Sequence, residues 1–438
     1  MNLEMPESDS KLNNILLKFG LEYIGWYGDP LQTLHNAVKD YPDFFLGYVF
    51  FAGLELTSTG TKSASNLITD PLKKAEELST KYKYSKQELL HYEAVIELSL
   101  GKWESATKIW ETILLEFPKD VLALKFAHDW YFYMGNLNST FESVDRVISH
   151  YDKDSKDNKD NKDSLLIYGY VCGMYSFGLE ENNRFKEAEE YGLKALEINP
   201  MDSWACHAVA HVMEMQGRQK EGIELLAQFF PDWSKCGGLA CHLFWHWTLY
   251  LIEIGSFKEA ISLYDNQISM KIESGAMLDL VDGSSFILRI EMENQNIYGR
   301  HEKLQNLWKP HIDDHITIFN DMHLAMIMDI KNPDIENVFF NTYPKENDEF
   351  SILRINLCKS ILHYRKKNYK EAASLIEPVL DKCVKIGGSN AQRDIIQLVY
   401  LNSLIFSKNP VVKTLLKERK EKKSNSGLTD RLMNKIDF

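Results

Sequence analysis

The stretch Asn183-Arg-Phe-Lys-Glu-Ala188, which leads to Pro200 one helix later, decides the fold of this chain. An asparagine or glycine ends one helix in a left-handed conformation, a small residue lets two helices approach closely, and the proline stops the second helix. The proline lies 15 residues after the aromatic both here, from Phe185 to Pro200, and earlier in the chain, from Trp103 to Pro118. These marks predict a closely packed helical hairpin.

The same marks recur along the chain, as Gly101-Lys-Trp-Glu-Ser-Ala106, Gly217-Arg-Gln-Lys-Glu-Gly222, Gly255-Ser-Phe-Lys-Glu-Ala260 and Asn368-Tyr-Lys-Glu-Ala-Ala373. The interval from Asn183 to Gly217 is 34 residues, which is the tetratricopeptide period. One such hairpin cannot bury its apolar stripe alone, so neighbouring hairpins must stack. The sequence therefore predicts an all-α fold, a tetratricopeptide-like α-solenoid of about six antiparallel helix pairs.

We expect one helical repeat domain over residues 1–405, followed by a charged C-terminal tail over residues 406–438. Within the domain, residues 152–163 (DKDSKDNKDNKD) contain no apolar side chain and predict a low-complexity surface loop. The tail contains the run Glu418-Arg-Lys-Glu-Lys-Lys423, which is more typical of a solvated helix end than of a binding signal.

Composition limits the function classes. The hydrophobic content of 44% provides a core, and the net charge of −13 disfavours binding to nucleic acid because phosphates are repelled. The six cysteines form no C-x-x-C pair, so we expect reduced thiols in a cytoplasmic protein. The first residues do not read as a signal peptide, and no apolar run approaches the roughly 20 residues that span a bilayer.

Two neighbouring repeats begin with the same histidine-rich sequence motif. Ala-Cys-His207-x3-His211 returns 35 residues later as Ala-Cys-His242-x3-His246. Residues four apart share one face of a helix, and the face of the first helix also includes Trp204, Glu214 and Arg218. Because the same motif occurs on two successive repeats, any explanation has to account for both helices. We therefore favour a shared polar pocket over hydrogen bonds that only fix the register of the repeats.

Other polar residues are candidates to join this pocket. His207, His211, His246 and Asp282 are the candidates for catalysis. Side chains expected to contact a ligand are Trp204, Glu214, Arg218, His242, Trp245, Asp129, His128, Asp279, Asp321, His323 and Arg393. A lone histidine such as His128 or His323 is more often a satisfied structural group, and Asp279 and Asp282 also suit a helix cap or an ion pair.

Three kinds of site fit these residues. A metal such as zinc or iron could be held by His207, His211, His242 and His246, although no H-E-x-x-H is present and Arg218 would bring a positive charge close. A metal-free cluster of histidine, glutamate and arginine could bind a carboxylate and move a proton. The groove of a repeat protein could instead hold a segment of a partner protein. No nucleotide-cofactor motif is present.

Linked motifs point to a family. The stretches HAVAHVMEMQGR (207–218), LACHLFWHWTL (239–249), LDLVDGSS (278–285), FNDMHLAM (319–326) and GGSNAQRD (387–394) resemble the tetratricopeptide repeat protein 38 family. The resemblance covers roughly residues 10–405 without the insert at 152–163, and it implies the repeat fold. In tetratricopeptide proteins the first helix of each pair lines a concave groove, which implies that the histidines face that groove.

The sequence thus favours a repeat protein with a concave pocket of His, Glu, Arg and Asp that binds a small polar or anionic ligand. Such a pocket suits an enzyme that uses histidine acid–base or metal chemistry. The alternative is a non-enzymatic scaffold that binds a protein segment, and the oligomeric state stays open.

Overall fold

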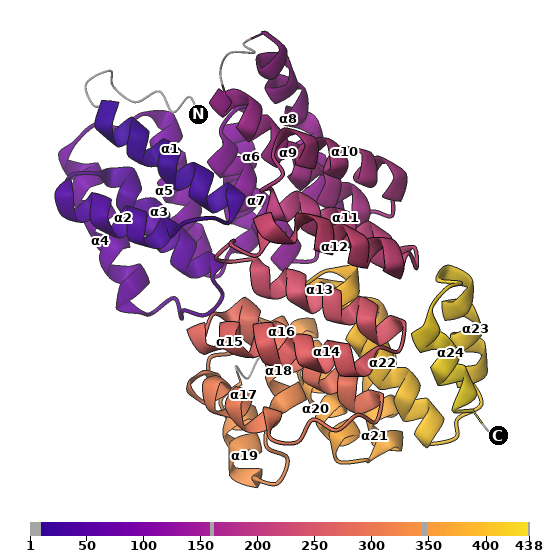
Figure 1. The fold of residues 1–438 in the computed structure, drawn as a ribbon. Coiled ribbons are helices and arrows are strands. Elements are labelled where there is room, and N and C mark those ends of the chain that lie inside the picture. The colour runs from indigo at the N-terminus through magenta and orange to yellow at the C-terminus, as the bar shows by residue number, and fades with distance from the viewer. Residues whose placement is uncertain (1–9, 158–161, 344–347, 437–438) are drawn as a thin grey trace. The chain divides into compact units, whose positions relative to one another are not determined.

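A computed structural model describes residues 10–157, 162–343 and 348–436 of the chain. Every regular element in these ranges is helical, and no strand occurs among them (Figure 1). The all-α prediction is confirmed. In the same ranges, none of the helices combines the length and the apolar character that crossing a membrane demands.

The chain divides into two compact units. Unit 1 comprises residues 1–212 and 228–240, and unit 2 comprises residues 213–227 and 241–438. Unit 1 contains α1 (Ser10–Gly25), α2 (Pro30–Asp40), α3 (Phe45–Thr57), α4 (Asn66–Lys81), α5 (Lys86–Ser99), α6 (Trp103–Glu116), α7 (Val121–Tyr133), α8 (Leu137–Asp157), α9 (Lys162–Glu181) and α10 (Phe185–Ile198).

Three helices carry the chain from one unit to the other. They are α11 (Ser203–Met215), α12 (Gln219–Trp233) and α13 (Ala240–Glu253). Unit 2 continues with α14 (Phe257–Leu263), α15 (Ser269–Lys271), α16 (Met277–Met292), α17 (Arg300–Trp308), α18 (Ile318–Ile327), α19 (Pro333–Asn341), α20 (Glu349–Arg365), α21 (Tyr369–Ile376), α22 (Asn390–Phe406), α23 (Val412–Lys422) and α24 (Gly427–Asn434). A π-helical segment, η1 (Tyr264–Ile268), and 3₁₀ segments, η2 (Ile272–Ser274), η3 (Lys309–His311) and η4 (Glu377–Ile386), join some of these helices.

The repeat marks act as the sequence predicts in four of the five copies; in the fifth, Lys367 and not Asn368 has a positive φ, of 63°, and Asn368 is the N-cap residue of the next helix. Gly101, Gly217 and Gly255 have φ of 74°, 72° and 80°, and Asn183 has φ of 60°, so each reverses the chain after a helix. Consecutive helices then pack against each other within each unit, as α9 does with α10 and α20 with α21. This arrangement of successive helix pairs is that of a helical-repeat protein.

The small residue of each hairpin is buried at the contact between helices. Ala106, Ala188 and Ala260 are fully buried. In the copy that ends in Gly222, a Cβ atom would lie 2.3 Å from Cζ of Tyr250, so the tyrosine ring fills the space of the missing methyl group. The close approach that the sequence predicts is therefore a real constraint on residue size.

The insert differs from its predicted loop conformation, and the C-terminal tail ends its charged run in a helix, as expected, but also packs on unit 2. Helix α8 continues into the acidic and basic insert as far as Asp157 and α9 begins at Lys162, so only part of 152–163 is outside a helix, and residues 158–161 lie outside the described residues. In the C-terminal tail, α23 and α24 contact each other and pack on unit 2, with Val412, Leu416 and Leu432 buried. The sequence did not indicate this packing, because the buried apolar residues are interspersed with charged ones.

Candidate functional site

The two histidine pairs lie on α11 and α13. His207 and His211 belong to the part of α11 in unit 1, whereas His242 and His246 belong to the part of α13 in unit 2. All four side chains are buried. Spacing of four places the two rings of each pair together: their centroids are 4.4 Å apart in the first pair and 4.7 Å apart in the second.

In unit 2, each histidine of α13 contacts a buried carboxylate. Nδ1 of His242 lies 2.9 Å from Oδ1 and 3.0 Å from Oδ2 of Asp282 in α16. Nδ1 of His246 lies 3.1 Å from Oε2 of Glu214, at the end of α11. Each carboxylate thus accepts a hydrogen bond from Nδ1 and orients the ring, which is how a carboxylate prepares a histidine for acid–base chemistry. The sequence had named all four residues as candidates.

Burial sets the charge of these groups. Desolvation, together with the charges of His242 and Arg289, holds the pKa of His246 well below its ordinary value. His246 is therefore neutral near pH 7. Desolvation also raises the pKa of Asp282, and the contact with His242 opposes that rise.

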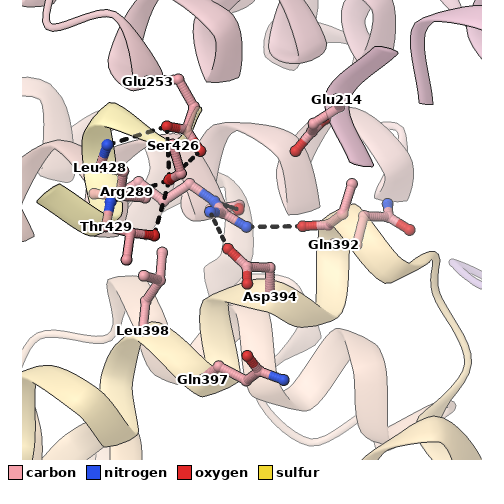
Figure 2. Close-up of polar contacts among 12 residues, drawn as sticks. Glu214, Glu253, Arg289, Gln392, Asp394, Gln397, Leu398, Ser426, Leu428 and Thr429 are labelled. Atoms are coloured by element: carbon pink, nitrogen blue, oxygen red, sulfur yellow. Dashed lines mark hydrogen bonds and ion pairs between the residues drawn. The ribbon is translucent and has the colours of Figure 1, made fainter. Parts of the chain in front are cut away.

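Arg289 of α16 brings a buried positive charge to the same unit. Its Nη2 donates to the carbonyl oxygen of Ala391 at 2.9 Å, Nε donates to Oγ of Ser285 at 3.3 Å, and Nη1 is 3.7 Å from Oδ2 of Asp394. The guanidinium also lies 5.7 Å from the ring centroid of Trp245. Figure 2 shows the guanidinium among polar side chains from several elements, Glu214, Glu253 and Asp394 among them. Burial lowers the pKa of Arg289 from its ordinary value, but a guanidinium starts so high that it stays protonated.

Two buried polar atoms near Arg289 make no hydrogen bond. His323 donates from Nδ1 to the carbonyl oxygen of Phe319 at 2.8 Å, so its Nε2 carries a lone pair, and that nitrogen has no partner. Burial lowers the pKa of His323 to about 4, and the charge of Arg289 acts in the same direction. The indole Nε1 of Trp245 is likewise buried without an acceptor. Buried polar groups are nearly always paired, so these two atoms are candidates to bind a ligand.

The C-terminal helices complete this network. Glu253, the last residue of α13, accepts hydrogen bonds from Oγ of Ser426 at 3.0 Å and from the backbone N of Leu428 at 3.0 Å (Figure 2). Arg419 of α23 binds both oxygens of Asp394, the longer contact being 2.9 Å. Burial alone would raise the pKa of Asp394, but the charges of Arg419 and Arg289 outweigh it and hold that pKa at about 2.

In unit 1, the histidines of α11 contact each other and two acidic residues lie close by. Nε2 of His207 is 2.9 Å from Nε2 of His211, and Nδ1 of His211 is 3.6 Å from Oε2 of Glu180 in α9. Phe177 packs on both imidazole rings, with centroids 5.5 and 5.6 Å away. Sequence reasoning missed Glu180 and Glu181, which are buried at the end of α9.

Trp204, His128 and Asp129 also lie in unit 1. Asp129 binds Nζ of the buried Lys125 at 2.5 and 2.6 Å and accepts from the hydroxyl of Tyr23 at 2.8 Å. Nζ of Lys125 is 5.6 Å from the ring centroid of Trp204. Burial and the charge of Lys125 lower the pKa of His128 to about 3, against a smaller opposing effect of the Thr140 backbone. Trp204, His128 and Asp129 are thus buried, but the sequence analysis did not predict that the cation beside them is Lys125.

The remaining candidates of unit 2 form local contacts. Helix α11 ends at Met215, so Arg218 leaves the predicted face and pairs with Glu221 at 2.7 Å in the following turn. Asp279 accepts from Oγ of Ser274 at 3.0 Å, and burial raises its pKa to about 6.

Asp321 is bound by Arg354 at 2.9 Å and by Nδ1 of His315 at 3.1 Å. Arg393 donates to Oδ1 of Asn390 at 2.9 Å and to the carbonyl oxygen of Gly388. Each contact joins an element to its neighbour or closes a turn, as a structural role predicts.

No model of a known protein family matches this chain.

Proposed function

We propose that this chain is a cytoplasmic tetratricopeptide-type repeat protein whose unit 2 binds a small anionic ligand at Arg289, next to the paired histidines of α13. The observation that carries the proposal is the set of unsatisfied buried groups around Arg289. Trp245 offers an N–H donor and His323 offers a lone pair, and neither atom has a hydrogen-bond partner among the residues that the structure describes. A ligand with both an anionic group and a hydroxyl or amine would pair with these two atoms and with the charge of Arg289.

The histidine pairs supply the chemistry for such a ligand. A neutral imidazole whose Nδ1–H is held by a carboxylate can accept a proton at Nε2, because the carboxylate stabilises the imidazolium that forms. Glu214 holds His246 in this way, and Asp282 orients the neighbouring ring of His242 through its Nδ1. General acid–base catalysis on a bound carboxylate or phosphate is therefore the reaction class that we propose for this site.

Burial favours a small ligand over a protein segment. His246 is fully buried and Arg289 is 5% exposed. An extended peptide needs an open groove along its length, whereas a small anion needs only a local site. The scaffold function remains the second candidate, and it predicts a protein partner whose binding does not depend on Arg289.

Binding of small anions to the purified full chain tests the proposal. Wild-type protein is titrated by calorimetry with acetate, succinate, citrate and inorganic phosphate. We expect at least one anion to bind, and Arg289→Gln to weaken that binding at least about 100-fold, since a buried charge-assisted contact contributes roughly 3 kcal/mol.

Arg365→Gln is the matched control. Arg365 is a partly buried arginine of unit 2, and its Nη1 donates to the carbonyl oxygens of Ala325 and Met328. This variant removes an arginine that binds carbonyl oxygens inside unit 2 and leaves Arg289 in place, so anion affinity should stay unchanged. Equal loss in both variants would show that the effect is one of stability, and the proposal would then be wrong.

A further inference from the structure

Unit 1 contains a compact group of metal-ligating side chains. Glu180 and Glu181 end α9, and His211 lies on α11. Their exposed fractions are 0%, 2% and 0%. Each residue offers one ligand atom, and these three atoms all lie within 4.8 Å of one another.

The donor set has the chemistry of a transition-metal site. One imidazole nitrogen with carboxylate oxygens is a mixture that zinc, manganese and iron accept, whereas calcium and magnesium prefer oxygen alone. Carboxylates are also expensive to bury as anions, and a divalent cation compensates two of them at once. Surface acidic clusters lack both features, because they contain no imidazole and are solvated.

A second histidine orients the first. Nε2 of His207 lies 2.9 Å from Nε2 of His211, so one of these nitrogens carries the proton and the other accepts it. When His211 donates from Nε2, its Nδ1 presents a lone pair toward Oε2 of Glu180, 3.6 Å away. Metal-bound histidines are usually fixed in this manner by a hydrogen bond from the other ring nitrogen.

The spacing suits a shared ion. Bonds of about 2.0–2.2 Å to zinc, at tetrahedral angles, place two ligand atoms about 3.4 Å apart. The 3.6 Å between Nδ1 of His211 and Oε2 of Glu180 is close to that value. Small side-chain rotations bring atoms that lie within 4.8 Å of one another into the same coordination sphere.

We propose that unit 1 binds one divalent transition-metal ion, of the zinc and manganese class, through Glu180, Glu181 and Nδ1 of His211. His207 is a positioning residue that holds the tautomer of His211. The ion would tie the end of α9 to α11, two helices separated in sequence by α10. The proposal shares no residue with the anion site of unit 2, so either can fail without the other.

Metal titration of the full-length protein tests this site. The purified protein is treated with chelator, dialysed, and titrated with Zn²⁺, Mn²⁺ and Co²⁺. We expect one tightly bound ion per chain by mass spectrometry, a Co²⁺ spectrum with visible bands from nitrogen and oxygen ligands, and a rise in the unfolding temperature with metal.

Isosteric variants assign the ligands. Glu180→Gln, Glu181→Gln and His211→Gln should each weaken binding by about 100-fold or more and change the Co²⁺ spectrum, because each removes a ligand atom. His207→Gln should weaken binding about 10- to 100-fold, as second ligand shells do. Glu187→Gln is the control, because Glu187 lies in α10 of the same unit and is exposed; it should bind as wild type does.

Two results would overturn the proposal. One is a chelated, folded protein that takes up no ion of the three. The other is metal binding that Glu180→Gln and Glu181→Gln leave unchanged, which includes the case in which only histidine variants matter. Circular dichroism of the metal-free variants checks that each one folds, and if one glutamine variant does not, the Co²⁺ spectrum of the other decides.

Discussion

At the scale of single residues, the protein keeps several histidines neutral by burying them. His246 and His323 in unit 2 both have a lowered pKa, caused first by desolvation. Nδ1 of His246 donates to Glu214, and Nδ1 of His323 donates to the carbonyl oxygen of Phe319. A neutral, oriented imidazole can donate a hydrogen bond to a ligand or accept one from it. Its burial in the neutral form also means that the stability of the fold decreases at low pH.

His323 therefore predicts a specific pH dependence of stability. Its pKa is about 4 in the folded protein and near 6.5 when unfolded. Between these values the unfolded chain carries one more proton, so stability is fully present above pH 6.5 and falls as the pH drops toward 4. His323→Gln should reduce the slope of unfolding free energy against pH by about 1.4 kcal/mol per unit between pH 5 and 6.

Chemical denaturation across this pH range measures the slope. Met326→Ala is the control, because Met326 is buried in the same helix, α18, and does not titrate. It should lower stability at every pH without changing the slope. An unchanged slope in His323→Gln would mean that His323 already carries its proton in the folded protein.

At the scale of elements, the C-terminal helices act as part of unit 2. Oγ of Ser426 caps α24 by accepting from the backbone N of Thr429 at 3.1 Å and also donates to Glu253 at the end of α13. Arg431 of α24 adds contacts to the carbonyl oxygens of Ile252 and Glu253. A carboxylate at a helix C-terminus is opposed by the helix dipole, so these donors, with Lys423 at 2.9 Å from Glu253, offset an unfavourable position.

Removal of the Ser426 hydroxyl should therefore destabilise unit 2. Ser426→Ala removes a helix cap and leaves the buried Glu253 with one donor fewer, which we expect to cost about 1–3 kcal/mol. Ser424→Ala, at an exposed position two residues earlier, should change stability by less than about 0.5 kcal/mol. Urea unfolding of both variants provides the comparison, and equal stability would contradict the contact with Glu253.

At the scale of the whole molecule, the sequence predicts what depends on local spacing. Gly217 and Gly255 end helices because positive φ favours glycine, and the interval between such marks sets the repeat. The histidine pairs follow from the spacing of four on a helix, and Asp282 could be named because it lies three residues after Asp279 and so shares a helix face with it. The fold class and part of the candidate site can therefore be predicted from local sequence spacing.

The missed features depend on contacts distant in sequence. Glu180 and Glu181 stand next to a turn, where acidic residues are normally solvated, and only packing buries them. Arg218 was misplaced because a helical pattern does not show that α11 stops at Met215. The docking of the tail depends on Ser426 meeting Glu253, which lies 173 residues earlier.

The division into two units leads to a prediction about fragments. Residues 228–240 belong to unit 1, and residues 213–227 belong to unit 2, so each unit is built from two separate stretches of chain. Helix α11 is continuous from Ser203 to Met215 and crosses the division after Val212. A fragment that ends at Val212 would lack the last turn of this helix and the 228–240 segment of its own unit.

We therefore expect the fragment 1–212 to fail as an independent domain. The loss of Trp233 and Leu239, which are buried in unit 1, removes roughly 3–5 kcal/mol of apolar packing, enough to unfold a marginally stable unit. The fragment 1–240 restores both side chains and should unfold more cooperatively and at a higher temperature. Calorimetry of the two fragments decides between these outcomes: a cooperative transition in 1–212 that matches the one in 1–240 would show that unit 1 does not need the returning segment.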